Sequence, residues 1–241
     1  MVATALHVDV LGVGAPMRAL VLHGLGSDCR TMWQLTSHLV NLGHEVHAAD
    51  LRGHGRSPAM DRYAVLDMVD DVALLGEGWD LVVGHSLGGA ILASLLTKPG
   101  FAARAVLIDP AISIVGEAAT FIAELILSEV GGRLTAEALF ARSPGWHPED
   151  RWRKVAASAL VSPHVIESCV KDSQPWSFQD TFTRWQCPVH ILAADPDLGA
   201  LFDPATIPGI EDLAHVTVTT VLGAGHSIHR DDTAAVLAAL A

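Results

Sequence analysis

The sequence has few cysteines, few aromatic residues and no long hydrophobic run. Its 241 residues include three cysteines, Cys29, Cys169 and Cys187, with no Cys-x-x-Cys spacing. Three cysteines cannot all pair within one chain, so we expect reduced, buried thiols and a cytoplasmic protein. No apolar run approaches the ~20 residues of a membrane-spanning helix. Residues 1–9 carry neither a basic flank nor a long apolar segment, and we expect no signal peptide.

Positive charge is also scarce. The chain has 15 lysines and arginines against 27 aspartates and glutamates, and its formal net charge is −12. This balance argues against electrostatic binding of nucleic acid or of an anionic membrane. Half of the residues are hydrophobic, which is too apolar for a disordered chain. A chain of this length can form one domain, or one domain with an insertion, and its sequence does not indicate an oligomeric state.

Apolar runs alternate with helical patterns over the first part of the chain. Buried strands are expected at residues 19–22, 45–49, 81–83 and 104–108. Helical spacing occurs at residues 30–42, 63–75 and 90–96. This alternation predicts an α/β fold with a mostly parallel, doubly wound sheet flanked by helices, and functional groups at the carboxyl ends of its strands. A weaker alternation at residues 6–11 predicts an opening strand at the sheet edge.

The strand pattern is absent between residues 111 and 187. Helical stretches expected at residues 118–130, 135–141 and 152–160 are separated by glycines and prolines, among them Pro148 and Pro163. Four tryptophans occur in this segment: Trp146, Trp152, Trp176 and Trp185. We interpret 111–187 as a helical lid inserted into a core made of 1–110 and 188–241. Within this segment the basic residues Arg151, Arg153 and Lys154 are typical of a solvated helix face.

The sequence GHSLG at residues 84–88 separates a predicted strand from a predicted helix and fits the pattern Gly-x-Ser-x-Gly. A serine on such a turn has a strained backbone, and its hydroxyl projects into open space. The flanking glycines are needed because a Cβ would collide with a neighbouring element. The first N–H groups of the following helix have no internal acceptor and can face a developing negative charge. Ser86 is therefore a candidate nucleophile.

A serine hydroxyl becomes nucleophilic when a histidine accepts its proton and a carboxylate orients that histidine. His226 follows the last predicted strand and precedes the final predicted helix. Three aspartates follow other predicted strands: Asp109, Asp195 and Asp197. The sequence thus offers a serine, a histidine and a carboxylate, each at the end of a strand.

With these elements the chain resembles the α/β-hydrolase superfamily over nearly its whole length. The sequences HG at 23–24, DLRGHGRS at 50–57, GHSLG at 84–88, LIDP at 107–110 and GH at 225–226 fall where that family has them. The order serine, acid, histidine is also the family's. The resemblance implies that Ser86 is the nucleophile and His226 the general base. It implies an oxyanion hole made of the backbone N–H groups of Leu25 and Leu87.

The resemblance leaves the acid open among three residues. Asp197 takes the acid position of the family's Gly-x-x-Asp motif, although Ala194 replaces the glycine, and it is the preferred assignment. Asp109 is an alternative because some members supply the acid from the strand after the nucleophile. Asp195 is another, since it lies directly at the strand end.

The resemblance implies a serine hydrolase of the carboxylic ester hydrolase class (EC 3.1-like). It would cleave a small or medium ester or lactone through an acyl-enzyme on Ser86, with no metal and no organic cofactor. Trp146 and Trp176 are candidates for substrate contact from the lid. A carbon–carbon bond hydrolase, a cofactor-free haloperoxidase and, in another class, a ligand receptor with slow turnover remain alternatives. The sequence HEVH at 44–47 lacks the i, i+4 histidine pair of a zinc helix, so we expect no metal site.

Overall fold

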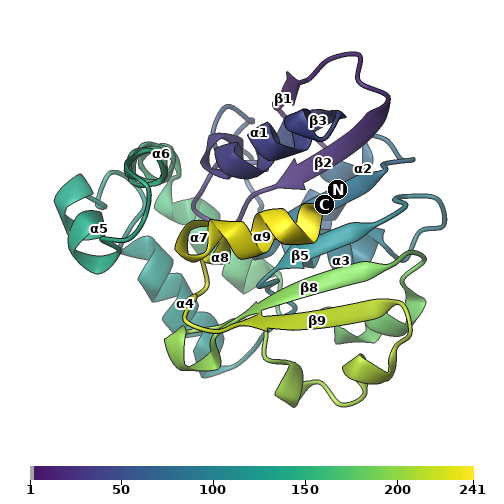
Figure 1. The fold of residues 1–241 in the computed structure, drawn as a ribbon. Coiled ribbons are helices and arrows are strands. Elements are labelled where there is room, and N and C mark those ends of the chain that lie inside the picture. Colours follow the sequence, from purple (N-terminus) through teal and green to yellow (C-terminus); the bar gives the residue numbers. More distant parts are fainter. Residues whose placement is uncertain (1–2) are drawn as a thin grey trace.

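The computed structural model describes residues 3–241, which form a twisted sheet with helices on both faces (Figure 1). Met1 and Val2, the start of the stretch in which no signal peptide is expected, lie outside the described residues. The main sheet has seven strands in the order β1-β3-β2-β4-β5-β8-β9. Its strands are β1 (Val8–Leu11), β2 (Met17–Leu22), β3 (His44–Ala49), β4 (Leu81–His85), β5 (Ala105–Ile108), β8 (Val189–Ala194) and β9 (Val216–Val221).

The sheet is parallel apart from β1, which pairs antiparallel with β3 at one edge, as expected. The register aligns the carboxyl ends of the central strands. Leu22 of β2 pairs with Gly84, and His85 of β4 pairs with Ile108. Farther along the sheet, the last residue of β8 pairs with the last residue of β9. The loops that follow these strands therefore meet at one edge of the sheet, where the candidate residues are found.

Helices bury both faces of the sheet. They are η1 (Cys29–Met32), α1 (Trp33–Asn41), α2 (Val65–Ala73), α3 (Leu87–Leu95), α8 (Ile228–Asp231) and α9 (Thr233–Leu240). Figure 1 shows α1 and α9 in front of the sheet and α2 and α3 behind it. Alternate residues of β2 belong to the two cores: Leu20 and Leu22 pack with α2 and α3, whereas Ala19 and Val21 pack with α1 and α9. Burial on both faces explains why the central strands read as continuous apolar runs.

The chain leaves the main sheet after β5 and returns to it at β8, and the intervening residues 111–187 are called here the helical segment. It contains α4 (Glu117–Leu127), α5 (Ala136–Arg142), α6 (Pro148–Leu160) and α7 (Pro163–Asp172), together with a two-stranded ribbon of β6 (Ser113–Ile114) and β7 (Trp176–Ser177). Figure 1 shows α4, α5 and α6 projecting beyond the sheet. None of the helices within residues 3–241 combines the length and the apolar character that crossing a bilayer requires.

Two helices of this segment differ from the sequence prediction. Helix α6 begins at Pro148 rather than at residue 152, and α7, which was not predicted, begins at Pro163. Both prolines were interpreted as breaks between helices. They occupy the first helical position, where the missing N–H costs nothing and the fixed φ favours the helix.

Candidate active site

Ser86 lies in a sharp turn between β4 and α3, as the motif predicts. Its backbone φ of 52° and ψ of −113° fall in a region that residues other than glycine rarely adopt. A Cβ at Gly84 would lie 2.7 Å from the carbonyl carbon of Gly88, and a Cβ at Gly88 would lie 2.6 Å from the carbonyl oxygen of Leu22. The turn therefore requires glycine on both sides of the serine, because backbone atoms occupy the space of a larger residue.

The carboxylate that contacts His226 is Asp109. The Nδ1 atom of His226 and the Oδ2 atom of Asp109 lie 2.6 Å apart. Asp109 is fully buried, and its carboxylate also accepts hydrogen bonds from the backbone N–H groups of Leu201 at 2.9 Å, Phe202 at 3.1 Å and Ala194 at 3.3 Å. Donors from the end of β8 and from the loop that follows it thus hold this carboxylate in one place beside the histidine.

Asp197, the acid preferred from motif register, makes no such contact. Pro196 begins a short 3₁₀ turn, η3 (Pro196–Leu198), in which Asp197 is exposed and its N–H donates to Oδ1 of Asp195 at 3.0 Å. The other oxygen of Asp195 accepts from the N–H of Gly223 at 2.8 Å. The geometry corrects the preference among the three aspartates: Asp195 ties two loops together, Asp197 faces solvent, and Asp109 contacts the histidine.

His85 joins the serine turn to the loop that carries His226. Its Nε2–H donates to the carbonyl oxygen of His226 at 3.0 Å, and the two ring centroids are 4.8 Å apart. The ring of His229 lies 4.4 Å from that of His85 on the centroids. Burial lowers the pKa of His85 well below its ordinary value, so the ring stays neutral. Because His85 directly precedes Ser86, this contact brings the serine turn and the histidine loop together.

Two buried histidines fix the loop after β2. Nδ1–H of His23 donates to the carbonyl oxygen of Gly24 at 2.8 Å, and its Nε2 accepts from the N–H of Leu51 at 3.0 Å. Nε2 of His54 accepts from the N–H of Gly26 at 3.2 Å. Burial lowers the pKa of His54 to about 3, which keeps that ring neutral and able to accept. The peptide groups on both sides of Leu25 are therefore anchored.

The two N–H groups of the expected oxyanion hole have no protein acceptor. Within residues 3–241, neither the N–H of Leu25 nor that of Leu87, the first residue of α3, donates to another group. The loop containing Leu25 touches the serine turn, since a Cβ on Gly24 would lie 3.1 Å from Cβ of Ser86. One unused donor consequently lies directly after the serine and the other in a loop that touches the serine turn, as the expected oxyanion hole requires.

The two tryptophans proposed for substrate contact have structural partners. The indole N–H of Trp146 donates to Oδ1 of Asp231 at 2.6 Å, and the other oxygen of Asp231 accepts from the N–H of Gly225 at 3.0 Å. The indole N–H of Trp176 donates to the carbonyl oxygen of Ala111 at 2.7 Å, and its side chain is buried in the core. Trp146 thereby ties the helical segment to the residue before the candidate base.

Lys154 does not lie where the sequence predicts. It was expected on a solvated helix face, but it is buried, and its Nζ donates to the carbonyl oxygen of Gly26 at 3.0 Å and pairs with Glu129 at 2.9 Å. Ala157 and Ser158, which share this face of α6 and are fully buried, are the signal in the sequence that the inward face includes Lys154. In the basic run, Arg151 and Arg153 are thus half-buried, and Lys154 contacts the candidate oxyanion loop.

The fold, the serine turn and the contact between His226 and Asp109 are accompanied by a match between residues 19–240 and the profile of the Alpha/beta hydrolase family. The chain belongs to this family of hydrolases.

The relatives of known name are hydrolases and related enzymes. The chain is 34% identical to lipase LipV of Mycobacterium tuberculosis over 168 residues, which cover 68% of this chain and 59% of LipV. It is 36% identical over 111 residues to a putative carbamate hydrolase, RutD, of Variovorax paradoxus, a match covering 43% of this chain and 42% of RutD. The matches thus span less than two thirds of these relatives' length.

Solved structures agree on the fold over the whole chain. An N-formylmaleamic acid deformylase from Pseudomonas putida S16 superposes with a TM-score of 0.77 at 22% identity, covering 98% of this chain and 96% of that one. An esterase from Exiguobacterium antarcticum superposes with a TM-score of 0.76 at 16% identity, covering 98% and 93% of the two chains. At these identities the likeness concerns the fold alone.

Proposed function

We propose that this chain is a serine hydrolase that cleaves a small or medium carboxylic ester or lactone through an acyl-enzyme on Ser86. The observation that carries the proposal is the hydrogen bond between His226 and a buried carboxylate, Asp109. This contact lies at the edge of the sheet where the carboxyl ends of the strands and the serine turn are found. Because the carboxylate of Asp109 accepts a hydrogen bond from Nδ1–H, the neutral ring of His226 offers its Nε2 as a base. This is the tautomer that a serine nucleophile requires.

The proposed reaction has two halves. The hydroxyl of Ser86 attacks the carbonyl carbon while His226 accepts its proton, and the oxyanion of the tetrahedral intermediate accepts hydrogen bonds from Leu25 and Leu87. Protonated His226 then gives its proton to the departing alcohol, leaving an ester on Ser86. Water, deprotonated by His226, attacks this ester, the bond between the acyl carbon and the Ser86 oxygen breaks, and His226 returns the proton to that oxygen as the acid is released. No metal and no organic cofactor takes part in these steps.

The substrate is proposed to lie beneath the helical segment, which acts as a lid on the core formed by residues 1–110 and 188–241. Ser86 is only 6% exposed, and the substrate is proposed to reach it under this segment. Ile126 and Val130 of the segment pack on the loop at Gly26, where a Cβ would lie 2.9 Å and 3.4 Å from their methyl carbons. An apolar cover of this kind favours a small apolar acyl group. Relatives named lipase, carbamate hydrolase and protein phosphatase methylesterase support hydrolysis at a carbonyl carbon.

The test is hydrolysis of p-nitrophenyl acetate and butyrate by the wild type and by Ser86→Ala. Removal of a nucleophilic serine costs on the order of 10⁶ in kcat, so activity of the variant should fall to the blank. Ser94→Ala, on the same helix α3, is the matched control and should retain activity. A serine-directed sulfonyl fluoride should label wild-type protein on the peptide that contains Ser86. Hydrolysis that survives in Ser86→Ala contradicts the proposal.

Peroxidase chemistry is the second candidate, because one relative, 31% identical over 110 residues, is a putative non-heme haloperoxidase of Mycobacterium phage D29. Bromination of monochlorodimedone in the presence of peroxide and acetate, faster than hydrolysis of any ester in a panel, would favour it. A diketone in the same panel tests carbon–carbon hydrolysis. Thermal stabilisation by a ligand without product formation would indicate a receptor.

A further inference from the structure

A buried lysine connects the helical segment to the candidate oxyanion loop. Lys154, in the second turn of α6, has its Nζ 3.0 Å from the carbonyl oxygen of Gly26. Gly26 directly follows Leu25, whose N–H is one of the two unused donors beside Ser86. Lys154 thus reaches from the helical segment to within one residue of a group assigned to transition-state binding.

The lysine is held by its own segment through two more charges. Oε2 of Glu129, in the turn after α4, lies 2.9 Å from Nζ of Lys154, and Oε1 of Glu129 lies 2.7 Å from Nη1 of Arg142 on α5. Burial lowers the pKa of Lys154, and the charge of Glu129 opposes this shift. A buried ammonium is costly unless it is paired and hydrogen-bonded, so the contact with Gly26 exists only while α4, α5 and α6 are assembled over the loop.

The peptide groups of the loop are anchored from two directions. His23 binds the carbonyl of Gly24, and His54 binds the N–H of Gly26, and both histidines belong to loops of the sheet. Lys154 binds the carbonyl of Gly26 from the helical segment. The two histidines are therefore in place whatever the helical segment does, whereas the lysine contact depends on how that segment is docked.

We propose that Lys154 is a positioning residue that sets the oxyanion loop when the helical segment docks on the core. The contact restrains the Gly26 carbonyl and, through the adjoining peptide, the direction of the Leu25 N–H. Catalysis is then coupled to closure of the segment, because an undocked segment leaves the loop held by the histidines alone. This inference rests on the proposed function of Ser86, and it adds a residue of the helical segment to the machinery of that site.

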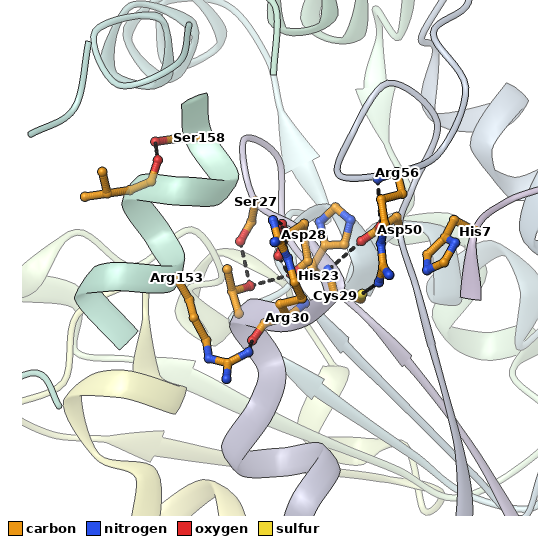
Figure 2. Close-up of polar contacts among 12 residues, drawn as sticks. His7, His23, Ser27, Asp28, Cys29, Arg30, Asp50, Arg56, Arg153 and Ser158 are labelled. Atoms are coloured by element: carbon orange, nitrogen blue, oxygen red, sulfur yellow. Dashed lines mark hydrogen bonds and ion pairs between the residues drawn. The ribbon is translucent and has the colours of Figure 1, made fainter. Parts of the chain in front are cut away.

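The experiment compares Lys154→Met with Lys154→Arg and with Arg153→Met on p-nitrophenyl butyrate. Arg153, the residue before Lys154, also joins α6 to the core, since its Nη1–H donates to the carbonyl of Arg30 at 3.2 Å (Figure 2). Small displacements of catalytic groups cost up to about 100-fold, and loss of a whole donor about 100- to 1,000-fold. We therefore expect kcat of Lys154→Met to fall on the order of 10- to 100-fold with KM nearly unchanged. Lys154→Arg should recover part of the loss, and Arg153→Met should keep the wild-type kcat.

A double variant separates positioning from folding. Glu129→Gln with Lys154→Met removes both buried charges, so the melting temperature should lie near that of the wild type, while kcat should stay as low as in Lys154→Met. Wild-type kcat in the double variant, or equal losses in Lys154→Met and Arg153→Met, overturns the inference. A wild-type protein without Ser86-dependent hydrolysis overturns the proposed function instead, and the two failures are distinguished by the Ser86→Ala control.

Discussion

At the scale of single residues, the candidate site depends on which ring nitrogen of each histidine carries the proton. His226 presents Nε2 as a base only if its proton sits on Nδ1, and the carboxylate of Asp109, which can only accept, enforces this arrangement. The neighbouring rings follow the same rule: His23 donates through Nδ1 and accepts through Nε2, so it can hold two backbone groups of opposite polarity. Such a site depends on carboxylate and carbonyl acceptors, because these groups cannot donate a hydrogen bond to the ring.

Asp109→Asn tests this directly. The amide can donate to Nδ1 of His226, which moves the ring proton to Nε2, the nitrogen proposed to accept from Ser86. We expect kcat for p-nitrophenyl butyrate to fall by about 10⁴ while the fold is retained. Asp197→Asn is the matched control and should leave kcat at the wild-type value, because Asp197 is exposed and its N–H donates to Asp195. A large loss of kcat in Asp197→Asn, together with wild-type kcat in Asp109→Asn, would instead support Asp197, the acid preferred from motif register.

The choice among the three candidate acids shows where sequence reasoning at this scale ends. The serine turn and the histidine loop are local patterns, and Ser86 and His226 are assigned as candidates without long-range information. The acid depends on loop conformations that no local pattern encodes. Asp109 is held by the N–H groups of Leu201 and Phe202, which are more than ninety positions later in the chain.

At the scale of elements, the unit that matters is the strand, turn and helix around Ser86. Helix α3 can approach β2 closely because Gly88 has no side chain, and the same absence at Gly84 lets the chain reverse. Element type was predictable here because apolar run, glycines and helical spacing all agree. Elements were less predictable in the helical segment, because Pro148 and Pro163 begin helices there instead of ending them.

Gly88→Ala should destabilise the protein markedly. Its Cβ would meet the Leu22 carbonyl oxygen at 2.6 Å, and that backbone atom belongs to a buried central strand that cannot move aside. Overpacking of this kind costs about 1–3 kcal/mol in the free energy of unfolding, measured by urea denaturation. Gly145→Ala is the control: its added Cβ meets nothing within 4 Å, so stability should be unchanged or rise by about 0.4–1 kcal/mol. Equal stability of the two variants would show that α3 has room the geometry does not indicate.

At the scale of the whole molecule, this architecture carries an energetic cost because it buries several neutral histidines beside one another. The buried rings near the candidate site are His23, His54, His85 and His229. Burial is the largest cause that lowers the pKa of each of them. The sequence shows 13 histidines but not which of them are buried, since burial depends on how loops from separate strands meet at the sheet edge.

Because of these histidines, the free energy of unfolding decreases as the pH falls below the histidine pKa in the unfolded chain. Between a pKa near 6.5 in the unfolded chain and the lower values in the fold, the unfolded state binds more protons, so the free energy of unfolding decreases as the pH decreases. For His54, whose pKa in the fold is about 3, the loss should reach about 2 kcal/mol between roughly pH 7 and pH 5. Aspartates and glutamates with lowered pKa values lose their contribution only at more acidic pH. Urea midpoints measured across this interval should therefore decline for the wild type.

The change of the free energy of unfolding with pH can be assigned to a residue by substitution. His54→Gln keeps an acceptor for the N–H of Gly26 and cannot bind a proton, so the variant should lose less stability than the wild type between roughly pH 7 and pH 5. His164→Gln is the matched control, because His164 is exposed, and it should keep the wild-type slope. A wild-type stability that stays flat across this interval, or equal slopes in all three proteins, would contradict the argument that neutral buried rings hold the loops of the candidate site together.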